Sequence, residues 1–237
     1  MNDQKTSLAQ ALMCTMQHGV SIAWWIILVA AVLSGAVSGC ANKKQHKKAD
    51  GYYQEGLANL PVDRQGAFVS FQKAVREDPN HRDAHYYIGH IYTLQQRYAE
   101  AEDEFRIVIS IDPDYPDAYN YLGQVVEAQG RTHEAIRLYR RALSYPLYQT
   151  PDIAWFNLGK ALANQGDMEG ATEAFQNALN VQPPNVPPGV LNLHMGRAYY
   201  RLGDDQKARE ALTRSASLDR GGEAGSEAEK LLERLRP

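Results

Sequence analysis

Three histidines are the residues of this chain best suited to metal chemistry. His81, His85 and His90 fall within ten residues, and the i, i+4 spacing of His81 and His85 can place two imidazoles on one helix face. A zinc site needs three or four ligands around one point. His81 is expected in the turn before a helix, His90 on another face, and no cysteine or paired carboxylate completes the set. We therefore predict no metal site.

Other catalytic patterns are also missing from the sequence. The acidic turn at 112–117 lacks the glycine and the terminal glutamate of a calcium loop, and aspartate at a helix start is ordinary capping. No phosphate-binding loop, nucleophile elbow or triad spacing occurs. We predict that the protein is not an enzyme and uses no cofactor and no small-molecule substrate.

The composition narrows the classes of partner. The chain has 237 residues, of which 44% are hydrophobic, so it can bury a sizeable core. Its 25 basic and 28 acidic residues give a net charge of −3, without the basic excess that a phosphate backbone requires. Its two cysteines, Cys14 and Cys40, both lie in the first forty residues, so no disulfide can join the rest of the chain. Nucleic acid is therefore not an expected partner.

Cys40 stands at the end of an apolar segment. Residues 20–37 carry no charge, and Ser38 and Gly39 lead directly into Cys40. The sequence Val37-Ser38-Gly39-Cys40 resembles a bacterial lipobox, which implies diacylglycerol on the Cys40 sulfur, cleavage before it and acylation of the new amino terminus. Several acyl chains hold a folded domain on a membrane, at about 0.8 kcal/mol per buried methylene. The alternative is an uncleaved anchor, since the apolar run is about long enough to span a bilayer.

The lipobox interpretation assigns 1–39 to a lipoprotein signal peptide and 40–48 to a lipidated, solvated tether. Many bacteria with two membranes retain a lipoprotein in the inner membrane when Asp follows the acylated cysteine, whereas Ala41 follows Cys40 here. The resemblance therefore implies an outer-membrane protein that faces the periplasm.

The remainder of the chain is periodic. Two residue types recur at intervals of 33 to 37 residues: glycine at 56, 89, 123, 159 and 196, and alanine at 67, 101, 135, 171 and 208. A fixed period in this range indicates stacked supersecondary units. Glycine and alanine at these places allow two helices to approach closely, and a bulky residue four positions after each alanine fills the space between units, namely Phe71, Phe105, Tyr139, Phe175 and Leu212.

This pattern is typical of the tetratricopeptide (TPR) repeat, in which each unit is a hairpin of helices A and B. It predicts an all-α, right-handed TPR solenoid with five repeats over 49–221, followed by a C-terminal capping helix within 222–237 that starts at Ser226. The expected hairpins are 49–81, 82–115, 116–151, 152–188 and 189–221.

The inner face of such a solenoid is the expected site for a protein client. In this register the A helices place along it Tyr53, Leu57, Tyr86, His90, Leu94, Asn120, Gln124, Glu127, Phe156, Lys160, Asn164, Leu193, Arg197 and Arg201. Apolar residues alternate with amides, and positive charge gathers toward the C-terminal end, which suits a peptide with apolar anchors and an acidic end. Each inward aromatic residue could instead pack against the next hairpin.

Chaperone-binding TPR domains use Lys and Asn one turn apart to grip a terminal carboxylate. Here Tyr86 and His90, then Asn120 and Gln124, stand at those positions. We therefore do not expect a chaperone clamp.

A lipobox followed by a TPR array resembles the pilot lipoproteins of type IV pilus biogenesis, the PilF/PilW/Tgl group. A two-residue insertion within 142–151, leading into Asn157-Leu158-Gly159, resembles the same junction in those proteins. The resemblance implies that the protein assists assembly of a secretin subunit at the outer membrane. The alternatives are an adaptor for peptidoglycan enzymes or other envelope complexes, and a regulatory subunit of an envelope protease.

Overall fold

The computed structural model describes residues 44–235, so the predicted signal peptide and Cys40 lie outside the described residues. Helices and the turns between them make up this part of the chain, which contains no strand. Across residues 44–235, no helix combines the length and the apolar character needed to cross a bilayer.

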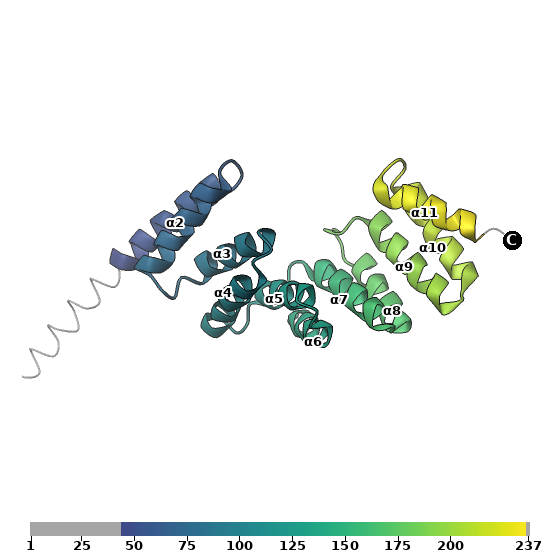
Figure 1. Ribbon diagram of the computed structural model, residues 1–237, viewed down its shortest axis with the longest axis horizontal. Helices are drawn as coiled ribbons and strands as arrows, with labels where there is room; N and C mark the ends of the chain where they lie inside the picture. Colours follow the sequence, from purple (N-terminus) through teal and green to yellow (C-terminus); the bar gives the residue numbers. More distant parts are fainter. Residues whose placement is uncertain (1–43, 236–237) are drawn as a thin grey trace, which may run out of the picture.

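The helices follow one another as antiparallel hairpins along the long axis of the molecule (Figure 1). Each helix contacts the next in sequence, and α3 with α5, α5 with α7 and α7 with α9 also touch. Such nearest-neighbour contacts define a solenoid, so the predicted all-α fold is confirmed. A helix at 44–59 precedes α2 (Arg64–Glu77), and the others are α3 (Arg82–Leu94), α4 (Tyr98–Ile111), α5 (Pro116–Ala128), α6 (Thr132–Leu143), α7 (Pro151–Gln165), α8 (Met168–Leu179), α9 (Pro188–Leu202), α10 (Asp205–Leu218) and α11 (Glu223–Arg234).

At both ends of the repeat array, the structure differs from what the sequence predicted. Residues 44–48, expected to belong to the tether, are helical and continue into the first repeat. Lys48 Nζ donates to Glu77 at 2.7 Å, and His46 Nδ1 lies 2.7 Å from Asp78, so these residues are held against the end of α2. At the other end, α11 begins at Glu223, not at Ser226, since the Asp219 carboxylate accepts from the Gly225 N–H at 3.0 Å and organises the preceding turn.

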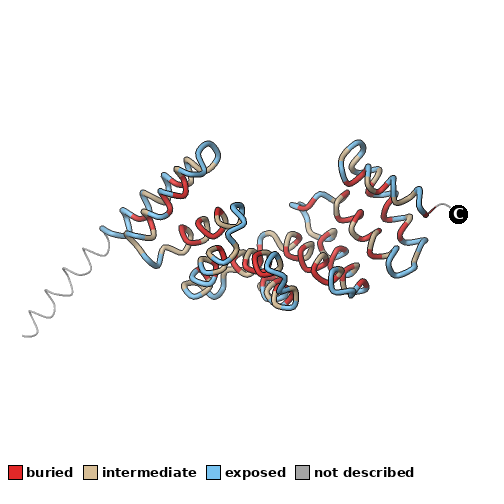
Figure 2. The backbone as a smooth tube through the Cα atoms, in the orientation of Figure 1, coloured by how far each residue is buried: buried red, intermediate tan, exposed pale blue. Residues whose placement is uncertain are grey.

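The recurring glycines of the A helices lie against bulky side chains of the B helices. Tyr139 and Phe175 are at most 1% exposed, and a Cβ added at Gly123 or Gly159 would come within 2.5 Å of Tyr139 or Phe175, respectively. Figure 2 shows the buried residues following the inside of successive hairpins. Glycine and alanine therefore recur at the positions where two helices approach each other most closely.

Two local features stabilise the turns between paired helices. Gly166 after α7 and Gly203 after α9 take the left-handed conformation, with φ of 91° and 75°, which costs glycine least. Asp167 and Asp204 then cap α8 and α10, accepting backbone N–H bonds at 2.9 and 3.0 Å. These pairs keep the hairpins tight.

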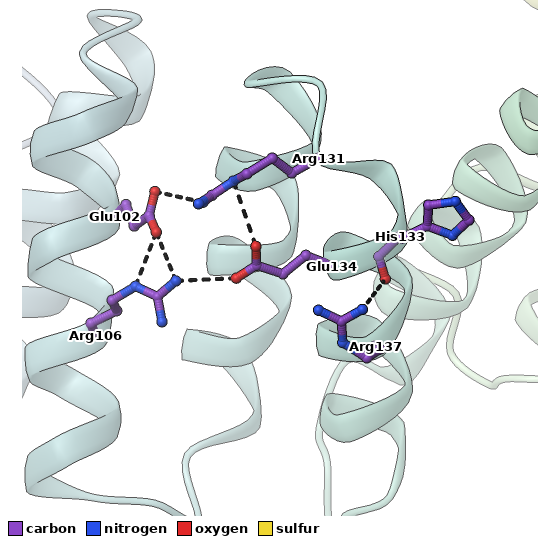
Figure 3. Close-up of polar contacts among 6 residues, drawn as sticks. All are labelled: Glu102, Arg106, Arg131, His133, Glu134 and Arg137. Atoms are coloured by element: carbon purple, nitrogen blue, oxygen red, sulfur yellow. Dashed lines mark hydrogen bonds and ion pairs between the residues drawn. The ribbon is translucent and has the colours of Figure 1, made fainter.

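An ion-pair ring connects the second and third hairpins on the outer surface (Figure 3). Glu102 of α4 lies 2.7 Å from Arg106 and 2.6 Å from Arg131, while Glu134 of α6 lies 3.1 Å from Arg106 and 3.6 Å from Arg131. Two arginines and two glutamates balance in charge. The ring therefore links adjacent repeats without creating a charged patch, and each exposed pair contributes little alone.

The connection from α8 to α9 is held by Asp152 at the start of α7. Asp152 is fully buried, and its carboxylate accepts the backbone N–H groups of Asn185 and Val186 at 2.6 and 2.8 Å, and the Asn185 amide at 3.0 Å. This cluster sets how the proline-rich segment 182–188 passes between the fourth and fifth hairpins.

The histidines noted for metal chemistry have separate structural contacts. His81 Nδ1 accepts the Ala84 N–H at 3.2 Å as the cap of α3, while His85 lies between Glu104 and the Pro79 carbonyl. In the part of the chain that the structure describes, no group of three His, Cys, Asp or Glu residues is arranged around a possible metal position.

His85 makes the stability of the second hairpin depend on pH. Its Nδ1 lies 2.6 Å from Glu104 Oε2 and its Nε2 3.0 Å from the Pro79 oxygen, and the imidazolium form can donate to both acceptors at once. Burial lowers the pKa of His85, but the bonds to Glu104 and Pro79 outweigh it and raise the pKa above 6.5. The stabilisation is full below the unfolded-state pKa, about 6.5, and is lost as pH rises through the folded-state value.

Urea unfolding between pH 6 and 9 should show this decline in the free energy of unfolding. His85→Gln should make the free energy of unfolding less dependent on pH in this range. An unchanged dependence on pH in the variant would contradict the assignment to His85.

Candidate protein-binding groove

Two hollows lie on the surface formed by the A helices. The central hollow, of about 340 Å³, is lined by Thr93, Tyr98, Gln124, Glu127, Ala128, Asn157 and Lys160. The C-terminal hollow, of about 180 Å³, is lined by Lys160, Ala163, Asn164, Met168, Phe175, His194, Arg197, Ala198 and Arg201. Lys160 borders both, so the two hollows adjoin on α5, α7 and α9, and together they are called the TPR groove.

The structure brings part of the predicted set into this groove. The polar and charged members predicted near its middle and end line the two hollows: Gln124, Glu127, Lys160, Asn164, Arg197 and Arg201.

Asn120 and Leu193 were predicted at the groove and are buried instead, at 2% and 6% exposure. The Asn120 carbonyl oxygen accepts from the Asn157 amide at 3.1 Å, which joins α5 to α7 inside the array. Leu193 packs with Leu212 and Ala228 beneath α11. Neither side chain lines a hollow, because neighbouring helices use both.

The predicted aromatic residues pack between hairpins. The ring centre of Tyr86 lies 5.5 Å from those of both Tyr115 and Tyr121, and burial raises the pKa of Tyr86. Tyr121 also lies 5.3 Å from His90. The ring centre of Tyr53 lies 5.9 Å from that of Phe71 within the first hairpin and 6.0 Å from that of Tyr87 in the second.

The three remaining predicted residues, Phe156, Leu57 and Leu94, have different surroundings. The ring centre of Phe156 lies 5.1 Å from that of His194. Leu57 is half-buried beside the core of the first hairpins, whereas Leu94 is 51% exposed. Most predicted residues outside the two hollows therefore contribute to the contact between repeats.

Models described as TPR repeat or tetratricopeptide repeat match residues 89–130, 110–152, 122–187 and 191–218. The chain is a tetratricopeptide repeat protein. No curated protein matches its sequence.

Several solved TPR structures are similar to this chain. One, described as a functional characterisation of Pseudomonas aeruginosa PilF, superposes with a TM-score of 0.64 at 23% identity, and the match covers 82% of this chain and 94% of that one. PilW, described as a widely conserved type IV pilus biogenesis factor, gives 0.63 at 23%, covering 78% and 92%. YrrB, described as a TPR protein with an unusual peptide-binding site, gives 0.61 at 22%, covering 76% and 90%. At these identities the likeness establishes the TPR fold alone.

Two residues that line the TPR groove, Asn157 and His194, were not predicted from the sequence. On α9 the residues that line the C-terminal hollow include His194, Arg197 and Arg201, and on α7 Asn157, Lys160 and Asn164 border the two hollows. Both sets have the spacing i, i+3, i+7, which marks one face of a helix. Counting three residues back from Lys160 and Arg197 would have identified Asn157 and His194.

The two hollows differ in charge. In the central one, Glu127 accepts from the Tyr139 hydroxyl at 2.8 Å, and Lys160 also lines the hollow, so both signs are present. The C-terminal hollow has Lys160, Arg197 and Arg201 but no Asp or Glu in its lining. Burial, then Arg197 and Lys160, lower the pKa of His194 to about 4, so His194 is neutral at pH 7. The TPR groove thus becomes cationic toward its C-terminal end.

Proposed function

We propose that this TPR protein is a lipid-anchored scaffold that binds a protein client at the bacterial envelope, and that the client is a secretin subunit. The observation that carries the scaffold role is the pair of adjoining hollows on α5, α7 and α9, which are lined by polar and charged side chains. No catalytic residue is needed for such a role. The likeness to PilF and PilW, which spans nearly their whole lengths, favours a pilotin role within it.

The proposed anchor is Cys40 in the outer membrane, with the TPR array in the periplasm. Its support is the lipobox at 37–40 and the uncharged residues before it. Lys44, the first described residue, is helical and follows Cys40 by four positions. A chain of that length spans at most about 15 Å, so acylation would keep the first hairpin close to the membrane surface.

A photo-crosslinking amino acid placed in the groove tests the client. Introduced at Gln124 in the native bacterium, it should capture a secretin subunit, because Gln124 lines the central hollow. The matched control is the same amino acid at Arg137, exposed on α6 at the outer surface, which should capture none. Mass spectrometry of the adducts provides the readout. Recovery of murein hydrolases without any secretin would reject the pilotin role and favour the peptidoglycan adaptor.

Cys40→Ala is the companion control for the anchor. It should abolish labelling by a palmitate analogue, leave the precursor uncleaved and remove the adduct from outer-membrane fractions. Undiminished labelling would reject acylation at Cys40.

A further inference from the structure

The C-terminal hollow holds an excess of positive charge in a protein whose net charge is −3. Among residues 44–235, neither Lys160 nor Arg201 has a carboxylate within ion-pair distance, and Arg197 has one, Glu227 of α11, at 3.3 Å. Cations gathered in a concave, partly apolar surface raise the local potential and attract anions. Charge complementarity therefore favours an acidic occupant.

The floor of this hollow is apolar. Met168, Phe175 and Ala198 are at most 8% exposed, and the neutral ring of His194 lies 5.6 Å from that of Phe175. At about 180 Å³ the hollow is smaller than the roughly 300–1,000 Å³ of small-molecule pockets. It accordingly suits one apolar side chain and not a cofactor.

Taken together, these features lead us to propose that the C-terminal hollow binds an acidic segment of the client, in which an apolar residue stands beside Asp or Glu. The apolar side chain enters above Phe175, and the adjacent carboxylate pairs with Arg197 and Arg201. Guanidinium groups suit this task because they bind carboxylates through two parallel hydrogen bonds. The inference rests on the proposed scaffold function and specifies the chemistry of its client.

Glu227 does not line the hollow, but it pairs with Arg197 at its edge at 3.3 Å. Its side chain and that of Arg197 are 38% and 41% exposed, and an ion pair so open to water is weak. A client carboxylate can therefore replace Glu227 on Arg197. The carboxylate of α11 thus acts as an internal competitor, and its removal should strengthen client binding.

The test uses the full chain, purified in detergent, and a random library of twelve-residue peptides. Selection should enrich peptides in which Asp or Glu neighbours Leu, Phe or Met. For the most enriched peptide, Arg197→Gln combined with Arg201→Gln should weaken the Kd about tenfold, since each 1.4 kcal/mol lost is a factor of ten. The control pair is Arg137→Gln with Arg140→Gln on the exposed face of α6, which removes the same charge and should leave the Kd unchanged.

Glu227→Gln supplies a gain of affinity that a purely structural effect would not produce. It should tighten the Kd about threefold, a change typical of an exposed ion pair. Glu229→Gln, at an exposed position of the same helix, should have no effect. Circular dichroism should show wild-type helicity in every variant, and the Glu227 result decides the matter if the arginine variants unfold.

Three results would overturn the inference. Enrichment of apolar peptides without acidic residues would reject the acidic segment and leave the scaffold role in place. A lack of any enriched peptide would contradict both proposals. If the full chain instead prefers phosphatidylglycerol to phosphatidylcholine vesicles, and the paired substitutions at Arg197 and Arg201 remove that preference while peptides fail to bind, the cations recognise lipid headgroups.

Discussion

Asp152→Ala is expected to lower the free energy of unfolding by about 3 kcal/mol, because it leaves the N–H groups of Asn185 and Val186 without their acceptor. Asp152 is fully buried, so water cannot easily take over these bonds. Asp152→Asn should cost less, since the amide keeps one acceptor oxygen. Urea unfolding followed by circular dichroism measures the difference.

Asp167→Ala is the matched control for Asp152. Asp167 also accepts a backbone N–H, that of Gly170 at 2.9 Å, but it is an exposed helix cap. Losing such a cap costs about 1 kcal/mol. If the two alanine variants were equally stable, the Asp152 cluster could not be what holds the segment between the fourth and fifth hairpins.

The second large effect is expected for Phe175→Ala, which should lower the free energy of unfolding by about 3–5 kcal/mol. Phe175 is 1% exposed, lies under Gly159 and forms the floor of the C-terminal hollow. The substitution leaves a cavity between α7 and α8 that the surrounding helices can fill only in part. Thermal and urea unfolding should both report the loss.

Leu218→Ala serves as the control for Phe175, since Leu218 is 60% exposed near the end of α10. Its stability should stay within about 0.5 kcal/mol of the wild type, as is usual for surface positions. A loss at Leu218 as large as that at Phe175 would mean that burial under the glycine is not the source of the effect.

Part of the predicted groove set lines the two hollows, and most of the other predicted residues pack between repeats. Lys160, Arg197 and Arg201 line the C-terminal hollow as expected, since residues one turn apart share a helix face. Leu193 was predicted there and His194 was not, although the two are neighbours in the chain. Successive residues of a helix differ in direction by about 100°, so a small rotation of α9 decides which of them faces the hollow.

The sequence by itself determined the repeated hairpins. Glycine and alanine recur because a larger side chain at the closest approach of two helices, such as Gly123 against Tyr139, has no room. Only the tertiary structure decided that Asp152 binds a segment more than thirty residues away, and that Glu227 reaches Arg197. Such contacts depend on how each hairpin is rotated against the next. Many small packing interactions together determine that rotation, so it cannot be read from any single spacing in the sequence.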